Sequence, residues 1–145
     1  MKRTPLKRKS KNPTAVAKDE IQGLLRAIAI KRDGGCVMRN YPETGLCGGH
    51  RTDGEIILQF DHLNTRARNI SYGDVRLGIC VCKRHHLYYK KQHPFEYERC
   101  AIGAIGKKRA ELLYRVRADR KMYSMGLWEW QKIIIGLKRE LEKLN

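Results

Sequence analysis

The chain has 145 residues and carries 31 Lys and Arg against 15 Asp and Glu, which gives a formal net charge of +16. This length accommodates one domain with tails and excludes two domains with cores of ordinary size. So large a positive charge predicts a polyanionic partner, and nucleic acid is favoured over a membrane because no stretch has the apolar length needed to span a bilayer.

The chain contains five cysteines and five histidines, which need a role. An odd number of cysteines and the lack of a recognisable secretory signal argue against a disulfide framework, so we expect a reducing, cytoplasmic environment. In such an environment, clustered cysteine and histidine residues first predict metal binding.

Residues 1–13 are expected to form a flexible basic arm. The stretch from Met1 to Lys11 has six bases and no acid, a composition that cannot bury enough apolar surface to become ordered. Contact with nucleic-acid phosphates, a nuclear-import signal and a solubilising tail are all compatible with this composition.

The arm is followed by a predicted helix that ends near Arg32. Asn12 and Pro13 are typical of an N-cap followed by the first helical residue, and apolar residues then recur at helical spacing. Gly34 and Gly35 are expected to end the helix. We interpret it as scaffold within a core domain of residues 14–106.

The centre of the chain predicts a compact ββα unit. The run EIILQF, from Glu55 to Phe60, has the length and composition of a strand, and it delivers Asp61 and His62 at its end. The segment LNTRARNISYGD reads as a polar loop, VRLGICV as a second strand, and KRHHLYYKK as the start of a helix. A histidine would then lie at the end of the first strand and another at the start of the helix, with room for one metal ion between them.

Cys36 and Cys47 predict half of a structural zinc site. Cys36 follows two glycines, and Cys47 lies in the sequence LCGGH. Glycine beside a cysteine lets backbone amides turn toward the sulfur, which is typical of zinc-binding turns.

The other two zinc ligands have two possible registers. In the first, Cys82 and His85 bind zinc and His86 binds a catalytic ion. In the second, Cys80 and Cys82 bind zinc and His85 is catalytic. We favour the first because Cys82 and His85 have ordinary zinc spacing, whereas Cys80 lies too close to Cys82 for easy tetrahedral ligation.

Asp61 and His62 alternate faces at the end of a strand, so they can have different roles. Hydrolysis of a phosphodiester needs an activated water and stabilisation of the charge that develops on the phosphate. We assign His62 as the general base and Asp61 as a ligand of Mg²⁺ or Mn²⁺, with His86 or His85 as the second ligand.

Several bases surround these groups and predict contacts that position phosphates, with an ordinary solvated surface as the alternative. They are Arg66, Arg68, Arg76, Lys83, Arg84, Lys90 and Lys91.

Residues 107–145 are expected to form a helical extension. One helix is predicted from Lys107 to about Arg120 and a last one from Ser124 to Leu144, with apolar residues alternating at steps of three and four. Such a seam is typical of packing on neighbouring helices or of a homodimer. Its residues are Leu127, Trp130, Ile134, Leu137, Leu141 and Leu144.

Taken together, these residues resemble the HNH, or His-Me finger, endonucleases, and more narrowly the phage NinG (Rap) recombination nucleases. The resemblance lies in the Asp-His pair at a strand end, in Asn69 or Asp74 in the following loop, and in the sequence CKRHH. The order of IKRDGGC, DHLNTRARNI, CVCKRHH and IGKKRAELLYRVR extends it over roughly residues 20–144.

The resemblance implies an α+β fold in which a ββα-metal core is held by structural Zn²⁺ and flanked by helices, with a long C-terminal helix. It implies a phage- or prophage-encoded, Mg²⁺- or Mn²⁺-dependent endonuclease that cuts branched DNA such as Holliday junctions or D-loops. Asn69 or Asp74 would hold the loop or orient His62. The alternative is a noncatalytic, zinc-containing nucleic-acid-binding protein.

Overall fold

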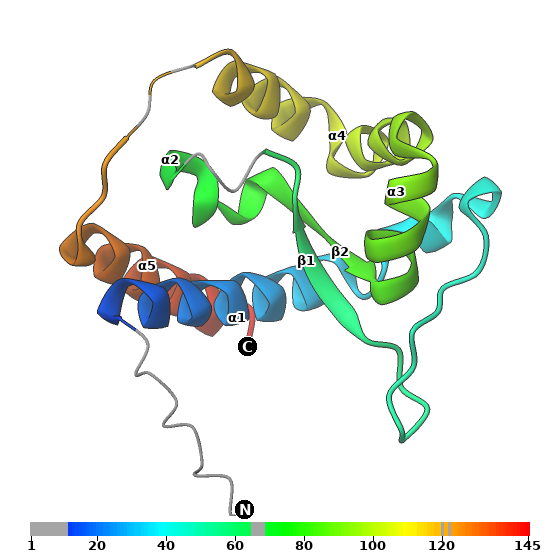
Figure 1. Ribbon diagram of the computed structural model, residues 1–145, viewed down its shortest axis with the longest axis horizontal. Coiled ribbons are helices and arrows are strands. Elements are labelled where there is room, and N and C mark those ends of the chain that lie inside the picture. Colours follow the sequence, from blue (N-terminus) through cyan, green and yellow to red (C-terminus); the bar gives the residue numbers. More distant parts are fainter. Residues whose placement is uncertain (1–11, 65–68, 120, 122) are drawn as a thin grey trace, which may run out of the picture.

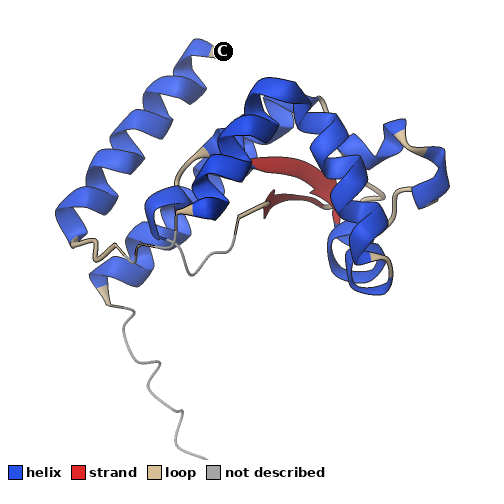
Figure 2. Cartoon of the chain, turned by 90° about the horizontal axis from the view of Figure 1, so that it is seen from above, coloured by secondary structure: helices blue, strands red, loops and turns tan. Residues whose placement is uncertain are grey.

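A computed structural model describes residues 12–64, 69–119, 121 and 123–145 of the chain (Figure 1). It is an α+β arrangement in which helices surround one two-stranded antiparallel sheet (Figure 2). The predicted basic arm falls almost entirely on residues 1–11, which lie outside the described residues. None of the helices in the described ranges is long and apolar enough to cross a membrane.

The first predicted helix is confirmed as α1, Pro13–Asp33. The side chain of Asn12 accepts a hydrogen bond from the backbone of the first turn at 2.7 Å, and Gly34 ends the helix in the left-handed conformation at φ 67°. Ile21 and Leu25, one helical turn apart, are fully buried. The helix therefore provides an apolar face on which the sheet packs.

The sheet consists of β1, Leu58–His62, and β2, Gly78–Cys82, with Phe60 opposite Cys80. β1 begins later than predicted, and it includes Asp61 and His62 instead of ending before them. β2 also begins later than predicted, because the preceding residues form a 3₁₀ turn, η3 (Val75–Leu77).

The polar loop between the strands contains a short helix, α2 (Asn69–Tyr72), that was not predicted. After β2, the chain enters a π-helical turn, η4 (His85–Tyr89), which continues as α3 (Lys90–Gln92). A helix was predicted here, although a π turn was not.

The next helix, α4, spans Pro94–Ala118 and is broken by Gly106, which has φ 77° and ψ 171°. The half beyond the break begins where the sequence predicted the helical extension to start, at Lys107. Leu113, beyond the break, is fully buried in the same apolar cluster as Tyr97, before it. Both halves of α4 thus cover the core.

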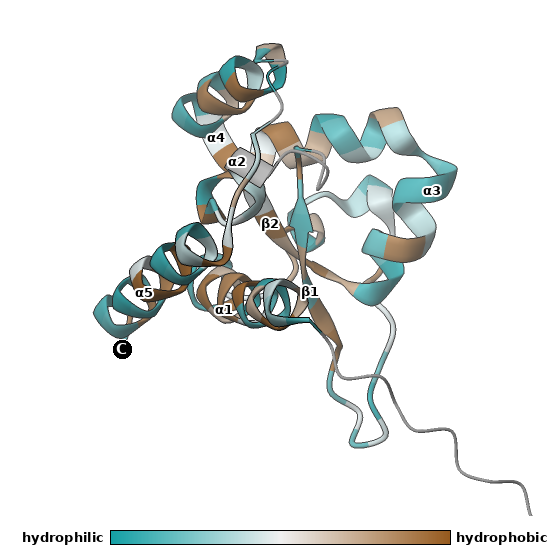
Figure 3. Cartoon of the chain, turned by 60° about the vertical axis from the view of Figure 1, so that its left-hand side comes forward, coloured by the Kyte–Doolittle hydropathy of each residue, from teal (hydrophilic) through white to brown (hydrophobic). Residues whose placement is uncertain are grey.

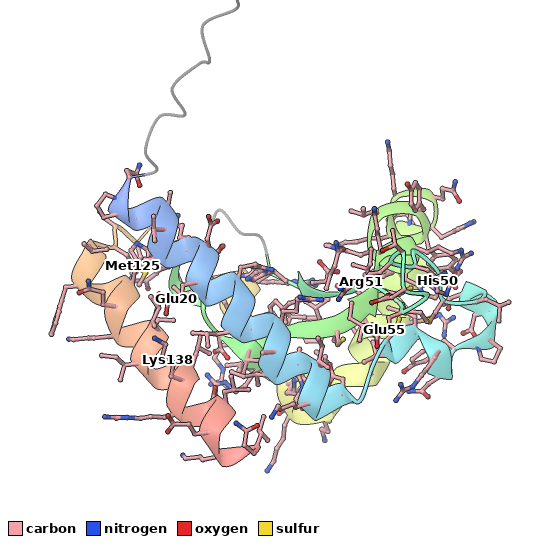
Figure 4. The ribbon with its side chains drawn as sticks, turned by 90° about the horizontal axis from the view of Figure 1, so that it is seen from below. Glu20, His50, Arg51, Glu55, Met125 and Lys138 are labelled. Carbon is pink, nitrogen blue, oxygen red and sulfur yellow. The ribbon has the colours of Figure 1, made fainter. Side chains whose placement is uncertain are left out.

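The last helix, α5 (Leu127–Lys143), packs along α1 (Figure 3). Trp130 and Leu137 of the predicted seam are buried against the apolar residues of α1. An ion pair of 2.9 Å between Lys138 and Glu20 joins the two helices (Figure 4). The seam is therefore used within the chain. The sheet lies between this α1–α5 cluster and the cluster beneath α4.

Candidate metal centres

Four side chains that the sequence predicted as zinc ligands come together. The ligand atoms of Cys36, Cys47, Cys82 and His85 all lie within 4.8 Å of one another. The Nδ1 atom of His85 is 3.0 Å from the sulfur of Cys82 and 3.6 Å from that of Cys36. Ligand atoms around a tetrahedral zinc ion are roughly 3.5 to 3.8 Å apart. The cluster therefore fits structural zinc.

Backbone groups fix the orientation of these ligands. The Nε2 atom of His85 lies 3.1 Å from the carbonyl oxygen of Thr44. Because a carbonyl only accepts, Nε2 carries the proton and Nδ1 presents its lone pair to the thiols. Arg84 donates to the carbonyl oxygens of Thr44 at 3.1 Å and Leu46 at 2.7 Å. Arg84, which was predicted to contact phosphate, thus supports the loop that carries Cys47.

Among the three cysteines, the cluster favours the thiolate at Cys82, whereas the pKa of Cys36 is raised chiefly by its hydrogen bond with Cys82 and that of Cys47 chiefly by burial. Hydrogen bonds from the Cys36 thiol and from the backbone N–H groups of His85 and Gly48 outweigh burial and lower the pKa of Cys82 to about 4. The loop approaches Cys82 closely enough that a Cβ atom at Gly49, where φ is 84°, would lie 2.6 Å from Lys83. Glycine is required at this position.

Cys80, the alternative zinc ligand, lies outside the cluster. It is fully buried among the residues between the sheet and α1, and burial raises its pKa to about 12. Its backbone N–H donates to the Asp33 carboxylate at 2.9 Å. The geometry thus agrees with the register in which Cys82 and His85 are ligands.

A second group of polar residues surrounds Asp61, which is only 3% exposed. Lys90 Nζ lies 2.8 Å from each carboxylate oxygen, and the Tyr97 hydroxyl donates to Oδ2 at 2.7 Å. His86 Nε2 approaches Oδ1 at 3.2 Å. Burial raises the pKa of Asp61, but the hydrogen bond from His86 and the charge of Lys90 outweigh it and bring that pKa down to about 2.

Asp61 and His86, two residues that the sequence predicted to share a catalytic ion, are in hydrogen-bond contact. Gln59 accepts a hydrogen bond from His86 Nδ1 at 2.6 Å, which leaves Nε2 facing Asp61. Lys90 shares the same carboxylate oxygen with His86, so three charged or polar side chains meet at Asp61 Oδ1.

His62 lies on the other face of β1. It is 9% exposed, and its Nε2 atom is 2.9 Å from the carbonyl oxygen of Tyr72. Its ring stacks on that of Tyr72, with centroids 5.0 Å apart, and meets the edge of Phe60. The sequence predicted one metal ion between a histidine at the end of the first strand and a histidine at the start of the helix. Instead, His86 contacts Asp61, because neighbouring strand residues face opposite sides of the sheet.

The other predicted site residues are distributed around these groups. The side chain of Asp74 caps η3 and pairs with that of Arg76 at 2.7 Å, and the described contacts of this carboxylate do not include His62. The side chain of Lys83 packs against Gly49, and Lys91 is exposed. Arg66, Arg68 and the side chain of Asn69 lie outside the described residues.

Two neighbours of Asp61 were missed by the sequence interpretation. Gln59 precedes Asp61 by two residues and so shares its strand face, a signal that the alternation could have given. Tyr97 lies 36 residues further along the chain, and no spacing in the sequence marks it.

No family model matches this chain, and comparisons with curated proteins and with solved structures likewise find no match. The α+β arrangement and a Cys₃His cluster able to hold zinc are thus findings of the structure, whereas the resemblance to the HNH endonucleases stays a prediction.

Proposed function

We propose that the protein is an HNH-type endodeoxyribonuclease that uses Mg²⁺ or Mn²⁺ to hydrolyse phosphodiester bonds in branched recombination intermediates. The observation that carries this proposal is the pairing of Asp61 Oδ1 with His86 Nε2 at 3.2 Å, across the strand β1 and the turn η4. Two antiparallel strands followed by a helical turn provide this pair, in the order that the resemblance implies.

Each residue has a distinct role in the proposed reaction. A bound Mg²⁺ or Mn²⁺ ion supplies charge stabilisation for the phosphate and for the departing 3′ oxygen. Asp61 offers an oxygen that stays anionic at neutral pH, since its pKa is about 2. His86 offers a nitrogen whose direction Gln59 fixes. His62, at the end of β1 but on the face opposite to Asp61, is assigned as the base that takes the proton from the attacking water, which therefore has to reach it around the end of the strand.

The Cys₃His cluster supports this arrangement through adjacent residues. His85 turns its Nδ1 atom to the thiols, and His86 turns its Nε2 atom to Asp61. Structural zinc would therefore fix the turn that carries the second ligand of the catalytic ion.

A single variant tests the role of His62. We expect His62→Ala to keep its fold and its affinity for a four-way DNA junction while cleavage with Mg²⁺ or Mn²⁺ falls by at least about a hundredfold. Circular dichroism, anisotropy binding with EDTA and a gel cleavage assay measure these three properties. Undiminished cutting by the variant would sink the assignment.

The second candidate function is a noncatalytic nucleic-acid-binding protein that contains zinc. It is favoured by Lys90, which occupies both oxygens of Asp61, and by the net charge of +16. Incubation of the wild-type protein with junction and matched duplex DNA, with each metal and then with EDTA, separates the candidates. Metal-dependent cleavage that prefers the junction supports the nuclease, and binding without cleavage under any metal supports the alternative.

A further inference from the structure

A groove lies over β1, between α1 and η4, and opens beside the candidate metal ligand His86. Its volume is about 370 Å³. The residues that line it are Gln22, Arg26, Ile57, Leu58, Gln59, Phe60 and His86. A ligand in this groove would lie against the residues that hold the Asp61–His86 pair.

We propose that this groove binds a phosphodiester group of the DNA strand, adjacent to the one that is cut, and that Arg26 is its phosphate contact. This inference rests on the proposed nuclease function, because the Asp61–His86 pair defines which phosphate is cut. Arg26 was not among the bases that the sequence marked for phosphate positioning.

Arg26 differs from several other arginines in having no acidic partner within the described part of the chain. Arg32, Arg76 and Arg117 each form an ion pair with a carboxylate. Arg26 is exposed, and its Nε atom donates to the carbonyl oxygen of Leu58 at 2.5 Å. This bond holds the guanidinium against β1 and leaves its terminal nitrogens for a bidentate contact with phosphate.

The groove does not suit an added peptide strand. Along β1, the carbonyl oxygen of Leu58 accepts from Arg26 at 2.5 Å and that of Phe60 accepts from Gln22 at 3.4 Å. A peptide that extended the sheet at this edge would need both acceptors. The positive charge of Arg26, the apolar surface of Ile57 and the net charge of +16 together favour a sugar-phosphate backbone.

The first test compares Arg26→Gln with Arg139→Gln. The control removes the same charge from an exposed position on α5, outside the groove. Affinity for a four-way junction is measured by anisotropy with EDTA over a range of salt concentrations. We expect Arg26→Gln to bind about tenfold more weakly at about 0.1 M salt and to lower the salt slope by about one. Equal behaviour of the two variants overturns the proposal.

Arg26→Lys separates charge from packing. It keeps the positive charge but changes the contact with Leu58, so we expect it to retain the wild-type salt slope. Loss of the slope in both Arg26 variants, with a lowered melting temperature, would assign the effect to damaged packing on β1 and would also overturn the proposal.

A second test locates the phosphate. In a series of DNA substrates, each phosphate near the cleavage site is replaced in turn by a methylphosphonate group, which carries no charge. If Arg26 contacts the phosphate adjacent to the cut, neutralising that phosphate weakens DNA binding by the wild-type protein and by Arg139→Gln about tenfold. The same replacement does not weaken DNA binding by Arg26→Gln further. An equal additional loss in Arg26→Gln at every position contradicts the contact.

The outcomes for the groove and for the nuclease are distinguishable. If the wild-type protein cleaves DNA but Arg26→Gln binds like the control, the groove proposal fails and the nuclease stands. If the wild-type protein cleaves no DNA with either metal, the nuclease proposal fails. The placement of the Arg26 contact beside a cut phosphate then fails as well, even if Arg26→Gln weakens binding.

Discussion

Lys90, whose side chain is 39% exposed, forms an ion pair with the buried Asp61 in which the Nζ atom lies 2.8 Å from both carboxylate oxygens, one of which also faces His86. A divalent ion bound by Asp61 and His86 must share that carboxylate with the ammonium group. Lys90 therefore competes with the ion that the proposed reaction uses.

We expect Lys90→Met to raise the affinity for Mn²⁺ about fivefold, because it removes a competing ion pair worth about 1 kcal/mol. Calorimetric titration of the zinc-loaded protein measures the change. Lys91→Met, at an exposed neighbouring position, should leave the affinity as it is. Weaker Mn²⁺ binding by Lys90→Met would mean that the lysine supports the metal site.

Removal of one zinc ligand should empty the Cys₃His cluster. We expect elemental analysis to find about one zinc ion per chain in the wild-type protein and much less in Cys47→Ser, with a loss of several kcal/mol in the free energy of unfolding. Cys100→Ala is the control, since Cys100 is buried outside the cluster. A metal-free wild-type protein that stays folded would contradict the assignment.

The pH dependence of stability should report Asp61. Its pKa of about 2 in the folded protein lies below the ordinary value, so its contribution is present above about pH 5 and is lost as the pH falls through about 4 to 2. We expect the stability difference between wild type and Asp61→Asn to be about 2 to 3 kcal/mol near neutrality and to shrink over that window. Urea denaturation at a series of pH values measures the difference, and a constant value down to pH 2 would refute it.

The packing of α5 on α1 predicts a monomer. Trp130 and Leu137 are buried within the chain, whereas Ile135 on the outer face is 49% exposed. We expect Ile135→Glu to have the same sedimentation mass as the wild-type protein, that of one chain. A dimeric wild type that dissociates in this variant would show that the outer face of α5 joins two copies.

Local sequence signals predicted much of the framework. Capping by Asn12 and Gly34 is determined within a few residues, so the bounds of α1 could be read directly. The set of zinc ligands followed from residue type and spacing, even though Cys36 and Cys47 lie in separate turns.

The roles of the basic residues could not be predicted in the same way. Arg84 and Lys90 were expected at phosphates, and tertiary packing places partners distant in the sequence beside each, whereas Arg76 pairs with Asp74 only two residues away. The alternation of a strand indicated that Asp61 and His62 face opposite sides. Which side His86 would join depends on the turn η4, whose π-helical form leaves no signature in the sequence.

That turn also sets a constraint on chain length. In η4 the backbone N–H of Lys90 bonds to the carbonyl of His85, one residue further back than in an α-helix. Loss of one residue here would rotate Lys90 by roughly 100° about the helix axis relative to His86, although the zinc ligands would be untouched. The exposed Leu87 and Tyr88 can thus vary in type. The number of residues between the Cys₃His cluster and α4, however, cannot change without separating Lys90 and Tyr97 from Asp61.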